Sequence, residues 1–123
     1  MSAEEFVSDH LKGHPVTVFS KKSCPYCVDV KELLYESGID YHEVLLDQEP
    51  NMREIQNYLY KVTGARSVPR VFIGDKCIGG YDNTVTLHDG LELVPMVLAA
   101  GGVVRPFYSF FRVALKWFLR LMR

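Results

Sequence analysis

The chain has 123 residues, and 48% of them are hydrophobic, which is enough for one compact core but leaves little for a second domain. Its net charge of −1 gives no indication of a nucleic-acid partner. The charges are unevenly placed, because residues 103–123 carry five basic residues and no acid, which leaves a net −6 on residues 1–102. We therefore expect one domain over residues 1–102 and a chemically different tail over residues 103–123.

The first fifteen residues are acidic and lack the apolar stretch of a secretory signal. Their acids also argue against a transit peptide. We therefore expect a reducing compartment, the cytoplasm. There, the three cysteines of the chain are more readily explained as catalytic or metal-binding than as a disulfide framework.

The first half of the chain predicts alternating strands and helices. Residues 15–20 alternate β-branched and aromatic side chains, as a short strand does. Residues 25–37 have apolar residues at helical spacing, and Gly38 follows where a left-handed cap belongs. Residues 40–46 predict a second strand, and a second helix is expected from Pro50 to Gly64.

The second half predicts a hairpin and a last major helix. Residues 70–80 contain two short runs separated by Gly74 and Asp75, which suit an antiparallel turn. The pattern over residues 84–100 is helical, with a break or kink marked by Gly90 and Pro95. The order β-α-β-α-β-β-α predicts an α/β domain, a small mixed sheet covered by helices.

Cys24 and Cys27 form a C-x-x-C pair in the first turn of the first of these helices. Their spacing brings the Cβ atoms to about 5–6 Å, within reach of a disulfide. The helix start and the ammonium groups of Lys21 and Lys22 are expected to favour the Cys24 thiolate. We therefore expect Cys24 to be the nucleophile and Cys27 the resolving thiol, with Tyr26 forming an apolar wall beside the sulfur.

Other interpretations of the thiol pair stay open. Two ordinary buried cysteines would also fit a lone C-x-x-C. A structural zinc site needs four ligands, and the only further candidates are Cys77 and four scattered histidines (His10, His14, His42 and His88). For Cys77, in the second strand of the hairpin, a buried and inert thiol is favoured over a reactive one.

Three segments in this order resemble the dithiol, CPYC-type glutaredoxins: FSKKSCPYC at 19–27, SVPRVFIGDKCIGG at 67–80 and GGYDN at 79–83. The similarity spans about residues 5–101. It implies a thioredoxin-like fold with a four-stranded mixed sheet flanked by helices. It also implies a glutathione-dependent oxidoreductase that reduces glutathione mixed disulfides and protein disulfides, with glutathione as co-substrate and no metal.

The resemblance further implies a glutathione site. Lys21 and Gln56 would meet one carboxylate of the tripeptide, and Val68, before a cis Pro69, would pair with its backbone. Each position also has a plain structural explanation: a turn proline, a solvated glutamine, an aspartate N-cap. The implied binding residues are Lys21, Tyr26, Gln56, Val68, Pro69, Gly80, Asp82 and Asn83, the last two holding the γ-glutamyl end at a helix start.

Two arginines close to this site, Arg66 and Arg70, either attract anionic glutathione or are simply solvated. A different class of function also stays open. Some glutaredoxins carry an iron–sulfur cluster between two copies, held by the first active-site cysteine and glutathione thiols. Those relatives usually have glycine or serine at the position of Pro25, so we expect the oxidoreductase and keep the homodimeric cluster carrier as the alternative.

The tail has a helical pattern of its own, outside the family resemblance. Its polar residues are spaced 4, 3, 4, 4 and 3 apart, and the remaining positions are aromatic or aliphatic. Charges inside the segment disfavour a membrane span. Contact with an acidic membrane surface, packing on the domain, self-association and binding to a partner protein remain open. The polar residues are Arg105, Ser109, Arg112, Lys116, Arg120 and Arg123.

Overall fold

The computed structural model describes residues 1–105 and 115–122. Its four strands form one sheet in the order β2-β1-β3-β4. β1 pairs with β2 in parallel, whereas the pairs β1–β3 and β3–β4 are antiparallel. This mixed sheet confirms the predicted fold class. The strands are β1 (Val16–Ser20), β2 (His42–Leu45), β3 (Arg70–Ile73) and β4 (Lys76–Gly79).

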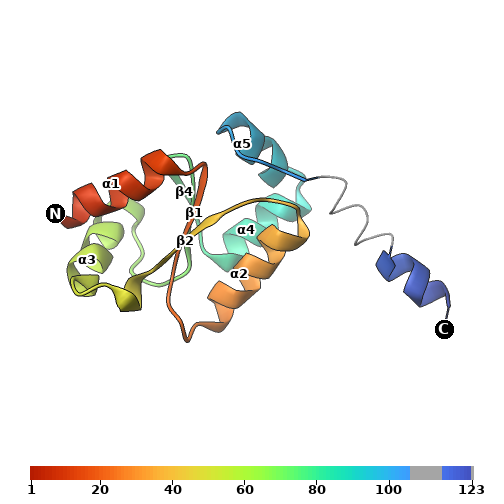
Figure 1. The fold of residues 1–123 in the computed structure, drawn as a ribbon, viewed down its shortest axis with the longest axis horizontal. Helices are drawn as coiled ribbons and strands as arrows, with labels where there is room; N and C mark the ends of the chain where they lie inside the picture. The colour runs from red at the N-terminus through yellow and green to blue at the C-terminus, as the bar shows by residue number, and fades with distance from the viewer. Residues whose placement is uncertain (106–114, 123) are drawn as a thin grey trace.

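Helices cover both faces of the sheet, with α1 and α3 on one side and α2 and α4 on the other (Figure 1). A short 3-10 helix, η1, follows β2 directly. The helices are α1 (Ala3–Gly13), α2 (Pro25–Glu36), η1 (Leu46–Gln48), α3 (Met52–Thr63), α4 (Tyr81–Asp89) and α5 (Leu93–Ala99).

The central strands alternate between two hydrophobic clusters, as the period of a strand requires. Val16 and Val18 of β1 and Val71 of β3 pack toward α2 and α5. Phe19 and Phe72 point to the opposite face and pack among residues of α1 and α3, with their rings edge to face. Every residue of β1 is buried, so the end of this strand is a rigid base for the loop that follows it.

The structure differs from the predicted elements at the N-terminus. Helix α1 was not predicted, although Ser2 accepts a hydrogen bond from the Glu5 N–H as its N-cap and Val7 is buried in the core.

The predicted helix over residues 84–100 consists of two helices. The break lies at Gly90 to Glu92, where Leu91 has a positive φ of 60°. Pro95 does not break the chain. It sits in the first turn of α5, where a missing N–H is tolerated.

Residues 103–105, just after the predicted boundary at residue 102, contact the domain. The Arg105 N–H donates to the Gly38 carbonyl at 2.8 Å, and the Asp40 N–H donates to the Val103 carbonyl at 3.2 Å. Val104 forms an isolated bridge with Ile39. Residues 103–105 are therefore held to the turn that follows α2.

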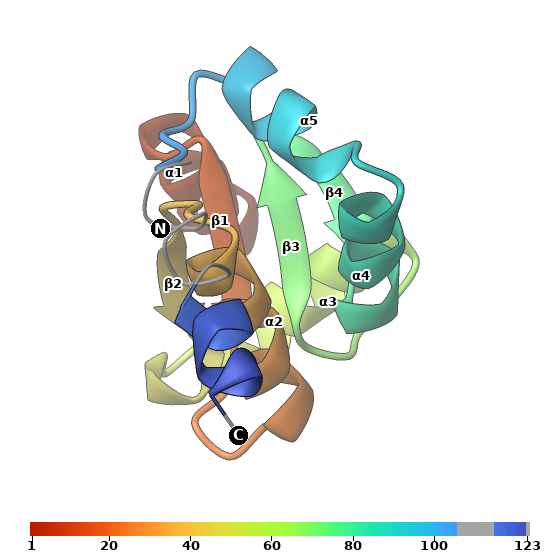
Figure 2. The same cartoon turned by 90° about the vertical axis from the view of Figure 1, so that its right-hand side faces the viewer.

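Residues 115–121 form a C-terminal helix, which lies in front of α2 in the view of Figure 2. The predicted helical tail continues through residues 106–114 and 123, including Ser109, Arg112 and Arg123, and these lie outside the described residues. None of the helices within residues 1–105 and 115–122 combines the length and apolar character needed to cross a membrane.

Candidate functional site

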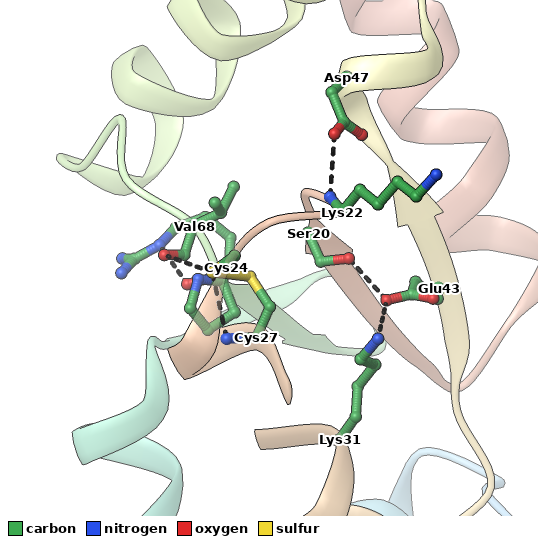
Figure 3. The surroundings of a disulfide bond; sticks show 10 residues. Ser20, Lys22, Cys24, Cys27, Lys31, Glu43, Asp47 and Val68 are labelled. Atoms are coloured by element: carbon green, nitrogen blue, oxygen red, sulfur yellow. Dashed lines mark hydrogen bonds and ion pairs between the residues drawn. A yellow bond between two sulfur atoms is a disulfide. The ribbon is translucent and has the colours of Figure 1, made fainter. Parts of the chain in front are cut away.

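Cys24 and Cys27 are joined by a disulfide, with their Cα atoms 5.2 Å apart (Figure 3). Cys24 is the N-cap of α2, and its Sγ accepts a 3.2 Å hydrogen bond from the Cys27 N–H. Pro25 occupies the first helical turn, as predicted. Cys27 is only 1% exposed, whereas Cys24 is half-buried, so Cys24 is the sulfur that a substrate can reach.

The loop that carries Cys24 is anchored to β2 and the turn behind it (Figure 3). The backbone N–H of Lys22 donates to Asp47 Oδ2 at 2.9 Å, while its side chain is exposed. Glu43 Oε2 accepts from Ser20 Oγ at 2.6 Å and pairs with Lys31 Nζ at 2.7 Å. Burial opposes ionisation of Glu43, but these two hydrogen bonds outweigh it and lower the pKa of the carboxyl group.

Val68 lies beside the thiol pair because the start of β3 is antiparallel to the end of β1, with Phe19 opposite Arg70. The Val68–Pro69 peptide bond is cis, as expected. The Val68 carbonyl oxygen is 3.8 Å from Cys24 Sγ (Figure 3). The residue before the proline therefore presents its backbone next to the accessible sulfur.

A pocket of about 360 Å³ opens at this point of the structure. Two of its aromatic walls are Tyr26 and Tyr81, whose ring centroids are 5.9 Å apart. Six of the predicted binding residues line it: Tyr26, Val68, Pro69, Gly80, Asp82 and Asn83. Three lining residues were not in the predicted set: Ser67, Arg70 and Tyr81.

The glycine-rich turn places the far wall of the pocket. Gly80 is the N-cap of α4, and its N–H donates to Asn83 Oδ1 at 3.1 Å. Asp82 is therefore not an N-cap. Its exposed side chain instead lies in the first turn of α4, where the positive end of the helix dipole faces the pocket.

Lys21 and Gln56, the other two predicted binding residues, do not line this pocket. Lys21 is half-buried in the loop between β1 and α2. Gln56, on α3, is also half-buried, and its Nε2 donates to the Arg66 carbonyl at 3.5 Å. Gln56 therefore touches the segment that leads to Val68.

The two arginines of this region have different positions. Arg66 pairs with Asn57 Oδ1, and its guanidinium lies 5.3 Å from the Tyr60 ring centroid, so it is turned toward α3. Arg70 Nε donates to the Pro69 carbonyl at 3.0 Å, which puts its guanidinium at the pocket. Nothing in the sequence favoured either arginine over the other as a contact for glutathione. In the structure only Arg70 of the two lines the pocket.

Cys77 lies away from the thiol pair, on β4, and is a free, half-buried thiol. Burial raises its pKa, although the Gly79 backbone and Arg70 act in the opposite direction. These observations agree with the expectation of an unreactive cysteine.

The four histidines are scattered along the sequence, but three of them are in contact in the structure. His10 Nδ1 is 2.9 Å from His42 Nε2, and the His14 ring stacks on His42 with centroids 3.6 Å apart. Stacked rings do not aim their nitrogens at one point. Within residues 1–105 and 115–122, no group of three or more His, Cys, Asp or Glu side chains is arranged to hold a metal ion.

Comparison with known proteins shows similarity to one family. The glutaredoxin family model matches residues 16–78. A glutaredoxin from Solanum lycopersicum is 48% identical over 103 residues, which cover 84% of this chain and 92% of the relative. A rice relative, the chloroplastic glutaredoxin-C4, is 48% identical over 96 residues, covering 78% of this chain and 72% of the relative.

The fold is also that of solved glutaredoxins. A crystal structure of a buckwheat glutaredoxin–glutathione complex superposes with a TM-score of 0.80 at 40% identity, covering 83% of this chain and 93% of that one. The thioredoxin-like fold, the C-x-x-C disulfide at the start of α2 and these matches agree with one another. The chain therefore belongs to the glutaredoxin family of glutathione-dependent thiol–disulfide oxidoreductases.

Proposed function

We propose that Cys24 carries out glutathione-dependent reduction of mixed disulfides. In this step the Cys24 thiolate attacks the glutathione-side sulfur of a protein–glutathione disulfide. A Cys24–glutathione bond forms, and the substrate sulfur leaves as a thiolate and takes up a proton. A second glutathione thiolate then attacks the glutathione sulfur on Cys24, which yields oxidised glutathione and restores Cys24.

The observation that carries this proposal is the position of Cys24 Sγ. The sulfur caps α2, is accessible where Cys27 is not, and lies 3.8 Å from the Val68 carbonyl beside the pocket. A helix N-terminus stabilises the thiolate form, which is the attacking species. The protein therefore has its nucleophile next to a backbone edge suited to bind a peptide.

We propose that glutathione lies along this edge. The backbone of Val68, a half-buried residue, would pair with the tripeptide as an added strand. The pocket between Tyr26 and Tyr81 would then hold the γ-glutamyl end, with its carboxylate at the N-terminus of α4 and its ammonium at Asp82. Lys21 and Gln56 would meet the other end of the ligand. The buckwheat relative was solved as a complex with glutathione, which supports glutathione as the ligand.

Protein disulfides require the second thiol. Cys24 would attack one substrate sulfur, and the Cys27 thiolate would displace the product by attacking Cys24, forming the disulfide seen in the structure. Two glutathione molecules then reduce that disulfide. Glutathionylated and disulfide-containing proteins are the proposed partners.

The two cysteines can be separated by mutation. Cys24→Ser should abolish both activities in an assay coupled to glutathione reductase. Cys27→Ser should keep the reduction of a glutathione mixed disulfide and lose the reduction of a protein disulfide. A Cys27→Ser variant that is inactive on both substrates would contradict the assigned roles.

The glutathione site can be tested with charge-matched pairs. Asp82→Asn should raise the KM for glutathione about tenfold, because a charge-assisted hydrogen bond is lost. Asp75→Asn, in the exposed turn between β3 and β4, is its control and should leave the KM unchanged. Lys21→Gln should also raise the KM, with Lys76→Gln as its exposed control on β4. An equal change in the KM for glutathione in each variant and its control would exclude this glutathione site.

The alternative function, an iron–sulfur cluster carrier, can be tested by the colour of the purified protein. An anaerobic preparation of the full chain with iron, sulfide and glutathione should remain colourless, since Pro25 stiffens the loop before Cys27. A brown, dimeric product would favour the carrier. The cytoplasmic location stays a prediction, because one relative is named chloroplastic.

A further inference from the structure

The C-terminal helix, residues 115–121, has two chemically different faces. Lys116 and Arg120 are four residues apart and therefore share one face. The rest of the helix surface carries only apolar side chains, which are Leu115, Trp117, Phe118, Leu119, Leu121 and, just beyond the helix, Met122. We propose that this helix binds the surface of anionic lipid bilayers, with the apolar face inserted and the basic face toward the headgroups.

The apolar face is uncovered. Trp117 is 60% exposed, Phe118 59%, Leu121 76% and Met122 69%. Such a contiguous group of large apolar side chains, next to charged residues, marks an interaction site on a soluble domain. The aromatic side chains of the helix are therefore more than half exposed and available to a partner.

Among the described residues, the domain does not bury these aromatic side chains. Residues 103–105 are held to the domain by backbone hydrogen bonds and the Val104–Ile39 bridge, and two ion pairs add to these contacts. Lys116 Nζ lies 3.5 Å from Glu36 Oε1, and Arg105 pairs with Asp40 at the base of the segment. Lys116 belongs to the basic face of the helix, so its pair with Glu36 turns that face toward the domain, while the apolar side chains stay exposed.

The charge distribution selects an anionic bilayer as the partner. Residues 103–123 hold five basic residues and no acid, whereas residues 1–102 hold nine basic and fifteen acidic residues. An anionic surface attracts the tail and repels the domain. Two tails of the same charge repel each other, which disfavours the pairing of two tails. Aromatic and aliphatic residues on one face with Lys and Arg on the other are typical of helices that lie in a membrane interface.

The attachment point determines which side of the domain faces the bilayer. Arg105 is hydrogen-bonded to Gly38, just after the C-terminal end of α2, and Cys24 caps the other end of the same helix. The 12 residues of α2 separate these ends by about 18 Å. Membrane binding therefore leaves the dithiol directed to the aqueous phase, and vesicles should not inhibit reduction of a soluble glutathione mixed disulfide.

Trp117 is the only tryptophan of the chain, so its fluorescence reports on the apolar face directly. The emission of the full chain should shift to shorter wavelength with vesicles of phosphatidylcholine and phosphatidylserine in equal amounts. The shift should be small with pure phosphatidylcholine and should reverse at high salt. No shift with the anionic vesicles would overturn the proposal. So would a short-wavelength emission without vesicles that grows with protein concentration, since that would identify a second copy as the partner.

Substitutions can test the contributions of the basic face and the apolar face to membrane binding one at a time. Replacing Lys116 and Arg120 together by Gln should weaken partitioning into the anionic vesicles roughly 25-fold, because each basic residue near the surface contributes a factor of about five. The matched control replaces Lys12 and Lys61, exposed on α1 and α3, and should partition like the wild type. Phe118→Ser with Leu121→Ser should abolish the Trp117 shift. Equal loss in the Lys12 and Lys61 control would overturn the proposal, and unchanged activity in solution would show that every variant is folded.

Discussion

The Ser20 hydroxyl donates a 2.6 Å hydrogen bond to the carboxylate of Glu43, at the point where β1 ends and the dithiol loop begins. The same carboxylate accepts from Lys31 of α2, so one side chain on β2 joins both segments that flank the loop. This arrangement fixes the start of the loop to the sheet and the body of α2 to the neighbouring strand.

Glu43→Gln should lower the free energy of unfolding at pH 7 by about 1 kcal/mol, since the charge-assisted bonds to Lys31 and Ser20 are weakened. The folded-state pKa of Glu43 is lowered below its usual value of 4.5. Its contribution is therefore present above pH 4.5 and is lost as the pH falls through the folded pKa. Urea denaturation should show the difference from wild type shrinking in acid. Glu32→Gln, exposed on α2, is the control, and an equal loss there would contradict the role of Glu43.

Gly79→Ala should destabilise the fold more than Gly64→Ala, although both glycines have positive φ, of 115° and 80°. A Cβ at Gly64 meets nothing within 4 Å, so it adds only backbone strain of about 1–2 kcal/mol. A Cβ at Gly79 would overlap Asn83, whose Oδ1 caps α4, and should cost roughly 1 kcal/mol more. Thermal unfolding measures both, and equal losses would argue against the crowding at Asn83.

Stability should decrease as the pH falls below 6.5, because of the histidine cluster. Burial, and then the neighbouring His14, lower the pKa values of His10 and His42, although Glu49 and Asp9 partly counteract this for His10. A lowered folded-state pKa means that the unfolded chain binds more protons between the two pKa values, so acid favours unfolding.

The His42→Asn variant should flatten this dependence in urea titrations between about pH 7.5 and 5.5. His88→Asn is the control, because His88 is exposed on α4 and pairs with Asp89 outside the cluster. A wild-type stability that does not change over this interval would show that the cluster does not couple protonation to folding.

Cys77 should be alkylated more slowly than a free peptide thiol in the reduced, folded chain at pH 7. Burial raises its pKa, so its thiolate fraction at this pH is smaller, and the side chain is also half-buried. Mass spectrometry after a short iodoacetamide pulse should find Cys24 modified first. In urea, where burial is removed, Cys77 should react as fast as a peptide thiol; preferential labelling of Cys77 in the folded chain would disprove its inert character.

Local patterns predicted the elements next to the site well. The alternation in β1, the helical spacing of α2 and the left-handed glycines at 38 and 64 each arise from backbone geometry within a few residues. The Val68–Pro69 cis bond and the GGYDN turn were expected from the family resemblance, and both occur at the pocket.

The features that were missed depend on contacts between distant segments. The meeting of His10 and His14 with His42 requires α1 to pack beside β2, which no local pattern specifies. Arg70 and Tyr81 enter the pocket because the start of β3 and the start of α4 converge there. Helix α1 did have a signal, the Ser2-x-x-Glu5 cap, which stood in an acidic segment considered only for targeting.

The sulfur of Cys24 has two roles, because the atom proposed to exchange partners also accepts the N–H of Cys27. A change in the redox state of that sulfur therefore also changes the strength of a hydrogen bond in the first turn of α2. A thiolate is a stronger acceptor than a disulfide or thioether-like sulfur, so the turn should be most protected when the enzyme is ready to react. Hydrogen exchange at the single amide of residue 27 would then follow the catalytic cycle from within the backbone.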